Sequence, residues 1–135
     1  MATMIRRLAY VSRPRPGLPL VEIPRIVGRS RVRNGLDEIT GVLLFTGLEF
    51  AQVIEGSPQN VSDVWARIRA DERHCDIVAC LDEQSPSRNF ADWRMGFPSA
   101  NSLVTQIAAW REHTGPWSAV ERDDMLRLFM TADAL

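Results

Sequence analysis

The segment from Ile39 to Gly56 constrains the fold most strongly, because it has the densest β signal in the chain. Two apolar runs flank residues 46–49, which predicts a β-hairpin with its turn at Thr-Gly-Leu-Glu. Side chains alternate along a strand, so the second arm places Gln52 on one face with two large apolar residues, Phe50 and Ile54. The opposite face carries alanine, valine and Glu55.

Gln52 has two interpretations if its face is buried. A buried amide costs about 1–3 kcal/mol unless its hydrogen bonds are met. The side chain is therefore either satisfied by backbone or water, or it reads the polar edge of a ligand with its donors and acceptor. A third possibility is that the opposite face of the strand packs into the core.

Length and charge predict one domain without a strong attraction to nucleic acid or membrane. The chain has 135 residues and a formal net charge of −1. The charge is uneven, because the first 33 residues contain many arginines and a single acid, Glu22. All basic side chains other than histidine are arginine, which either reflects codon bias or suits forked contacts to phosphate or carboxylate.

The cysteines and the N-terminus predict a cytoplasmic protein. Cys75 and Cys80 match neither a CxxC pair nor a disulfide framework, so we expect free thiols and no metal site. The N-terminal residues contain no apolar signal region, and no apolar run approaches the roughly 18 residues of a membrane span.

The first third of the chain predicts a strand, a loop and a helix. Residues 5–12 alternate as a strand with Tyr10, the sole tyrosine, on one face, and a proline-rich loop follows. Residues 20–34 have helical spacing, and the regular part should begin near Pro24 because proline suits a first turn. Asn34-Gly35 predicts the end of this helix, with Asn34 as an ordinary cap.

The next elements complete a ferredoxin-like α+β fold. A helix should begin after Gly56 with a favourably placed proline, and Arg67 and Asp71 can pair along it. Residues 76–81 predict a strand, 82–92 an irregular segment, and 93–97 a short strand with Trp93 and Met95 on one face. The order is βαββαββ, an antiparallel or mixed sheet with two helices on one face.

The C-terminal part predicts two further helices. Residues 101–112 carry apolar residues at helical spacing, and Ser118 to Glu121 form a capping box that opens the second helix. The helices have too little apolar surface to stand alone. We expect domain limits of 1–98 and 99–135, with the helices (apolar residues Leu103, Ile107, Trp110, Met125, Leu128 and Phe129) packed on the free sheet face.

Several blocks in one order resemble the BLUF family of blue-light sensors that bind flavin, over about residues 5–97. They are Leu8-Ala-Tyr-Val-Ser12, Arg33-Asn34 before Ile39-Thr-Gly41, Phe50 to Gly56, Ala66 to Asp71 with Arg73-His74, and Phe90 to Phe97. One block alone is a weak signal. Together, with their intervals in register, they are a strong one.

The resemblance implies a flavin, FAD or else FMN, held between the two helices over the sheet. It implies that Tyr10 is the light-active tyrosine, that Gln52 lies between it and the flavin, and that Asn34 bonds the ring. Trp93 and Met95 match a pair that exchanges in and out of the pocket. The implied flavin-binding residues are Tyr10, Ser12, Arg33, Asn34, Phe50, Gln52, Arg67, Ile68, Asp71 and Met95.

Three positions depart from the family pattern. Many members have an amide or histidine in place of Arg33 and glycine in place of Glu38, and Pro24 intrudes into the first helix. The arginines at 29–33 either serve the FAD pyrophosphate or are solvated surface charge.

The resulting expectation is a short stand-alone photoreceptor without enzymatic activity. Light would drive electron and proton transfer from Tyr10 through Gln52, and the signal would leave by contact with a second copy, as a dimer, or with a downstream protein. Neither nucleic acid nor membrane is an expected partner. The alternatives are an acylphosphatase-like enzyme, disfavoured because no glycine-rich phosphate loop is found, and an interaction module with an empty pocket.

Overall fold

The computed structural model describes residues 3–98 and 100–132. In chain order the elements are β1 (Ile5–Pro14), the 3-10 helix η1 (Leu20–Glu22), α1 (Ile23–Leu36), β2 (Thr40–Phe45), β3 (Phe50–Gly56), α2 (Pro58–Ala70), β4 (His74–Ser85), β5 (Arg94–Gly96), the 3-10 helix η2 (Asn101–Leu103), α3 (Val104–Glu112) and α4 (Ala119–Thr131). This order confirms the predicted α+β arrangement.

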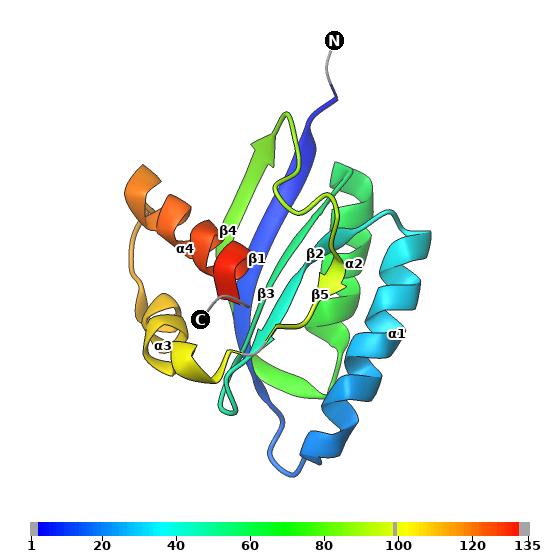
Figure 1. The fold of residues 1–135 in the computed structure, drawn as a ribbon, viewed down its shortest axis with the longest axis vertical. Helices are drawn as coiled ribbons and strands as arrows, with labels where there is room; N and C mark the ends of the chain where they lie inside the picture. Colours follow the sequence, from blue (N-terminus) through cyan, green and yellow to red (C-terminus); the bar gives the residue numbers. More distant parts are fainter. Residues whose placement is uncertain (1–2, 99, 133–135) are drawn as a thin grey trace.

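The five strands form one sheet in the order β4-β1-β3-β2-β5. The four long strands pair antiparallel, and β5 pairs parallel to β2. Figure 1 shows α1 and α2 on one face of the sheet and α3 and α4 on the other. The ferredoxin-like mixed sheet with helices on both faces is therefore confirmed.

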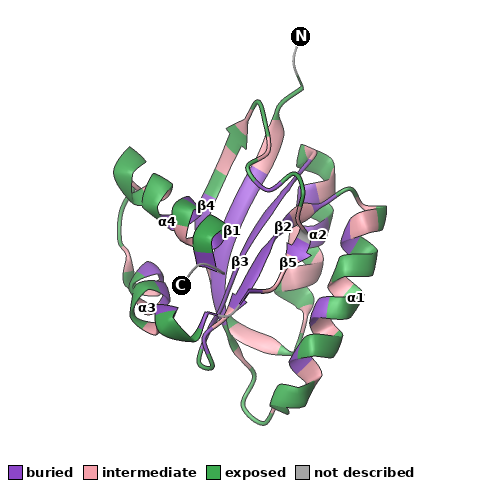
Figure 2. Cartoon of the chain, viewed as in Figure 1, coloured by how far each residue is buried: buried purple, intermediate pink, exposed green. Residues whose placement is uncertain are grey.

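The sheet separates two apolar cores. The core under α1 and α2 contains Leu8, Tyr10, Phe50 and Ile54, and the core under α3 and α4 contains the alternate residues of the same strands. Strand β3 is buried along its whole length, as Figure 2 shows. Both faces of β3 are thus core faces, and Gln52 is 6% exposed.

Local signals explain where the helices begin. Ser57 caps α2 by accepting a hydrogen bond from the Asn60 amide, and a proline occupies the first turn of both α1 and α2. The predicted capping box of α4 is present, with Ser118 and Glu121 bonded reciprocally. Each of these signals acts within one turn of the chain, so it can be identified from sequence.

Two predicted boundaries were wrong. Helix α1 continues to Leu36 and its C-cap is Asp37, so Asn34 lies within the last turn and is not the cap. The left-handed turn that follows is made by Glu38, with φ of 54°. Strand β4 runs to Ser85, into a segment predicted to be irregular, because it pairs with β1 along its length.

The prediction that Trp93 and Met95 share a face was also wrong. Met95 has φ of 115°, and the pairing of β5 with β2 shifts register at Gly41 and Val42. An irregularity of this kind breaks the alternation of side chains. Met95 consequently lies in the core under α1 and α2, whereas Trp93 packs against the core under α3 and α4.

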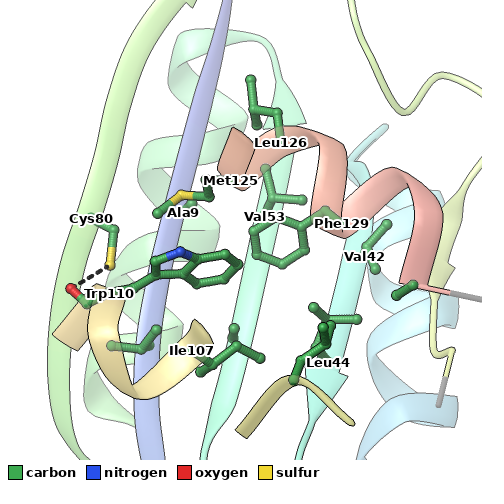
Figure 3. Close-up of a cluster of buried hydrophobic side chains, with 14 of the residues drawn as sticks. Ala9, Val42, Leu44, Val53, Cys80, Ile107, Trp110, Met125, Leu126 and Phe129 are labelled. Carbon is green, nitrogen blue, oxygen red and sulfur yellow. Dashed lines mark hydrogen bonds between the residues drawn. The ribbon is translucent and has the colours of Figure 1, made fainter. Parts of the chain in front are cut away.

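The C-terminal helices cover the free face of the sheet as predicted. Figure 3 shows Trp110 and Phe129 over the strands, and their ring centroids lie 5.4 Å apart. A nearly buried ion pair adds to this packing, because Arg111 Nε donates to Glu49 Oε2 at 2.6 Å with side chains 12% and 9% exposed. Arg111 Nη1 also donates to the Asp76 carbonyl.

We predict that Arg111→Met lowers the free energy of unfolding by about 3 kcal/mol, because Glu49 would remain buried without its partner. Urea denaturation followed by tryptophan fluorescence measures this. The matched control is Arg127→Met, which breaks an exposed pair with Asp124 and should change stability by less than about 0.5 kcal/mol. Equal losses in the two variants would contradict the role of Arg111 in docking α3.

Candidate functional site

A tyrosine and a glutamine meet on the sheet face under α1 and α2. Tyr10 and Gln52 are directly paired on β1 and β3, and the Tyr10 hydroxyl donates to Gln52 Oε1 at 2.5 Å. Gln52 Nε2 donates to the sulfur of Met95 at 3.1 Å. The predicted contact between Tyr10 and Gln52 is confirmed, and the Gln52 amide has protein partners on both sides.

Two adjoining cavities open between α1 and α2 above this pair. The inner cavity is lined by Tyr10, Ile26, Ser30, Leu43, Phe50, Gln52, Ile68, Asp71, Arg73 and His74. The outer cavity shares several of these residues and adds Arg29, Arg33, Asn34, Val64, Arg67 and Ala70. Eight of the ten residues predicted to bind the cofactor, from four different elements and the residue after α2, thus line these two adjoining cavities. Ser12 and Met95 line neither.

The environment of Tyr10 keeps its phenol neutral. The ring lies 5.3 Å from Trp65 and 6.1 Å from His74, measured between centroids. Burial, and secondarily the negative charge of Asp71, raise the pKa of Tyr10 well above its ordinary value of 10. Tyr10 therefore remains protonated at neutral pH.

The predicted pair between Arg67 and Asp71 was wrong. Arg67 reaches across to the end of α1 and pairs with Asp37 at 2.5 Å. Asp71 has extended backbone angles after α2, which turn its side chain away from the helix toward Arg73, at 2.6 Å. Hydrogen bonds from Arg73 lower the pKa of Asp71, so it keeps the negative charge that acts on Tyr10.

Ser12 lies beside the cavity and is not among its lining residues. Its hydroxyl bonds to His74 Nδ1 at 2.8 Å, and His74 Nε2 bonds to the Ile68 carbonyl at 2.6 Å. Because a carbonyl only accepts, Nε2 carries the hydrogen, and in a neutral imidazole Ser12 donates to Nδ1. His74 thus connects β1 to the end of α2 near Tyr10.

Asn34 and the arginines of α1 provide polar groups at the outer cavity. Asn34 is 5% exposed, and its carboxamide forms no hydrogen bond with any residue in the described part of the chain. Arg29 and Arg33 line the same cavity, while Arg31 Nε donates to the Met95 carbonyl at 3.0 Å. The Asn34 amide is thus available to a partner that enters the outer cavity.

Sequence reasoning missed several lining residues. Ser30 lies one helical turn before Arg33 and Ile26 two turns before it, so a helical-face argument could have found both. Leu43 and Val64 are ordinary apolar core residues by sequence and gave no functional signal. Arg73 and His74 belong to a matching block, yet the loop geometry that turns them toward the cavity is tertiary.

Comparison with known families shows which family the chain belongs to. The family model described as sensors of blue light using FAD matches residues 5–96. The chain belongs to the BLUF family. It is therefore a flavin-binding blue-light sensor, with Tyr10 and Gln52 hydrogen-bonded beside the cavity under α1 and α2.

Individual BLUF proteins agree with this assignment. The dark-state structure of BlrB, a BLUF protein, aligns with a TM-score of 0.76 at 32% identity over 99% of this chain and 98% of that one. An antirepressor of Escherichia coli K12 regulated by blue light and temperature is 36% identical over 87 residues, which are 64% of this chain. A photoactivated adenylate cyclase subunit beta of Euglena gracilis is 31% identical over 112 residues.

The chain spans only a minor part of these curated BLUF relatives, 22% of the antirepressor and 13% of the cyclase subunit. The similarity therefore concerns the sensor part that they share. No helix within the described residues is long and apolar enough to cross a bilayer. The described residues also contain no group of histidine, cysteine and carboxylate side chains that could hold a metal ion, and both cysteines are free thiols.

We predict that Tyr10 resists ionisation in the folded BLUF domain. Because the chain has one tyrosine, tyrosinate absorbance reports this residue alone. The unfolded chain should titrate near pH 10 and the folded chain only at higher pH, since burial raises the folded pKa. The stability due to neutral Tyr10 is present below pH 10 and is lost as pH rises from there through the folded pKa.

Asp71→Asn should lower the pKa of Tyr10 in the folded protein toward 10, because it removes the nearby negative charge that raises this pKa. Asp124→Asn, on the outer surface of α4, is the control and should leave it unchanged. Superimposable titrations of folded and unfolded protein would contradict the buried environment of Tyr10.

Proposed function

We propose that Tyr10 is the photochemical electron and proton donor and that Gln52 relays the proton and stores the signal as a changed hydrogen-bond pattern. The observation that carries this proposal is the 2.5 Å hydrogen bond from the Tyr10 hydroxyl to Gln52 Oε1 at the floor of the cavity. A bound flavin, once excited by blue light, supplies the oxidant.

The donor geometry fits a coupled transfer. The phenolic proton points along the bond to Gln52 Oε1, so loss of an electron from Tyr10 can be accompanied by loss of that proton to the amide. Both the electron and the proton return to Tyr10, so the cycle leaves no chemical product. The Gln52 amide can return in a different rotamer or tautomer, because it has donors and an acceptor that can exchange places.

The contact with Met95 keeps the free-energy cost of reorienting the Gln52 amide low. A thioether sulfur is a weak hydrogen-bond acceptor, so turning Gln52 Nε2 away from Met95 loses little. In a buried site each rearranged bond has more effect than in water. The combination of one strong and one weak partner gives Gln52 two accessible arrangements, which is the property of a switch.

The remaining cavity residues suit the cofactor. Asn34 presents an unmatched carboxamide, which would bond the donor and acceptor edge of the ring. Arg29 and Arg33 would hold the phosphate that FAD and FMN both carry. Phe50 and Ile68 would contact the ring faces. Arg67 on α2 and Asp71 just after it would line the side of the pocket formed by that helix. Arg67 forms an ion pair with Asp37, so its main role is to join α2 to the end of α1 at the edge of the cavity.

We predict that blue light shifts the flavin absorption band reversibly to the red in the natural protein, and that Tyr10→Phe or Gln52→Leu removes the shift. Both variants should still bind flavin, because the cavity is otherwise intact. The matched control is Gln59→Leu, on the exposed face of α2, which should keep the shift. Absorption spectra before and after illumination measure this, and a normal shift in Tyr10→Phe would refute the donor role.

The output of the sensor is proposed to leave through the C-terminal helices by protein contact. The helices from residue 101 onward would form an output segment, distinct in role from the sensor core, and would engage a second copy or a downstream protein. The relationship to an antirepressor regulated by blue light supports a protein partner. Structurally, Trp93 packs into the core under α3 and α4 one residue before β5 begins, and Met95 on β5 contacts Gln52.

We therefore predict that illumination changes hydrogen exchange in residues 93–98 and 100–130. A rearranged Gln52 would alter the contact with Met95, and the altered strand would change how firmly α3 and α4 pack. Exchange measured on dark and continuously lit samples tests this, with β4 as the internal reference. Equal protection in both states would exclude this route and place the output on the side of α1 and α2.

A further inference from the structure

Glu55 is a buried carboxylate that the photochemistry does not use. It lies on β3 on the face opposite Gln52 and is 0% exposed. Its oxygens accept three hydrogen bonds, from Arg7 Nε at 2.7 Å, from the Asn89 amide at 2.9 Å and from the Phe90 amide at 2.7 Å. A buried charge is stable only with such complete pairing, so its partners must keep their places.

Two of these partners are backbone amides of the loop between β4 and β5. The Glu55 carboxylate therefore fixes the backbone of the loop and not merely a side chain. Arg88 supports the same attachment, because it donates to the Glu38 carbonyl at 2.9 Å and to Thr40 Oγ1 at 2.9 Å. The loop is thus tied to the ends of β2 and β3 at adjacent residues.

The loop in turn places Met95. The Trp93 amide donates to the Phe90 carbonyl at 3.1 Å, and the Trp93 carbonyl accepts from the Gly41 amide at 2.8 Å. Strand β5 has three residues and pairs with only two residues of β2, so its own hydrogen bonds hold it weakly. Met95 also has a positive φ, a conformation that persists only when its surroundings impose it.

We propose that Glu55 is a positioning residue for the photochemical site: through Asn89 and Phe90 it holds the loop that keeps the Met95 sulfur against Gln52 and the Trp93 ring on the opposite face. This inference rests on the proposed role of Gln52. Glu55 touches neither the cavity nor Tyr10, and it acts only by fixing where β5 lies. It makes the methionine, and not the tryptophan, the neighbour of the Gln52 amide.

Glu83 provides a matched control. It shares Arg7 with Glu55, accepting from Arg7 Nη1 at 2.9 Å, and it also pairs with Arg122 of α4 at 3.2 Å. Unlike Glu55, it does not accept from the amides of Asn89 and Phe90, which both donate to Glu55. Glu83→Gln therefore removes one negative charge from the same arginine without releasing the loop.

The test compares Glu55→Gln, Glu83→Gln and the natural protein, each loaded with flavin. Glu55→Gln should broaden or shift the dark flavin band and speed the dark recovery by about fivefold or more, the factor expected for losing one hydrogen bond. Hydrogen exchange in residues 88–96 should rise in the same variant. Glu83→Gln should stay within about twofold of the natural rate, with the natural dark band.

Arg88→Met keeps the inference testable if Glu55→Gln does not fold, because it releases the loop without removing a buried charge. It should change the dark band and the recovery rate in the same direction as Glu55→Gln. Two results would overturn the positioning role. One is a dark flavin band and a loop hydrogen exchange unchanged from the natural protein in both Glu55→Gln and Arg88→Met. The other is an equal effect of Glu55→Gln and Glu83→Gln on the band and the recovery rate. A natural protein without a red shift would refute the photochemical proposal instead, and the dark band and exchange would still decide the role of Glu55.

Discussion

Strand β3 is buried on both faces, and this constraint organises the rest of the molecule. Every polar side chain on the strand must find its partner inside the protein. Gln52 finds Tyr10 and Met95 on one face, and Glu55 finds Arg7 and a loop on the other. The sensing site and the attachment of the β4–β5 loop are therefore consequences of the same buried strand.

The two faces of the sheet have different chemical tasks. The face under α1 and α2 combines a neutral phenol, an amide with one strong and one weak partner, and cationic groups at the outer cavity. The face under α3 and α4 is an aromatic and aliphatic core closed by the Arg111–Glu49 pair. Strand β5 and the residue before it connect them, because Met95 belongs to one core and Trp93 to the other.

Charged residues in this protein act largely as connectors between elements. Arg67 joins α2 to the end of α1, Arg31 joins α1 to β5, and Arg88 joins the β4–β5 loop to β2. A planar guanidinium with several donors suits such bridges better than a single ammonium group. The arginine-rich composition therefore has structural uses in addition to any contact with phosphate.

Local sequence determined the strands, the helix starts and the faces of β1 and β3, because period-two alternation and capping depend on neighbouring residues. This sufficed to place Tyr10 and Gln52 on one face, and their joint register with Asn34 indicated the family. Only the tertiary structure decided that Arg67 pairs with Asp37, that Asn34 is not a cap, and that Met95 and Trp93 face opposite cores. The first and last of these depend on contacts between distant segments, namely the Arg67–Asp37 pair between two helices and the irregular pairing of a short strand with β2. The end of α1 depends on the left-handed backbone of Glu38, a conformation that its residue type does not predict.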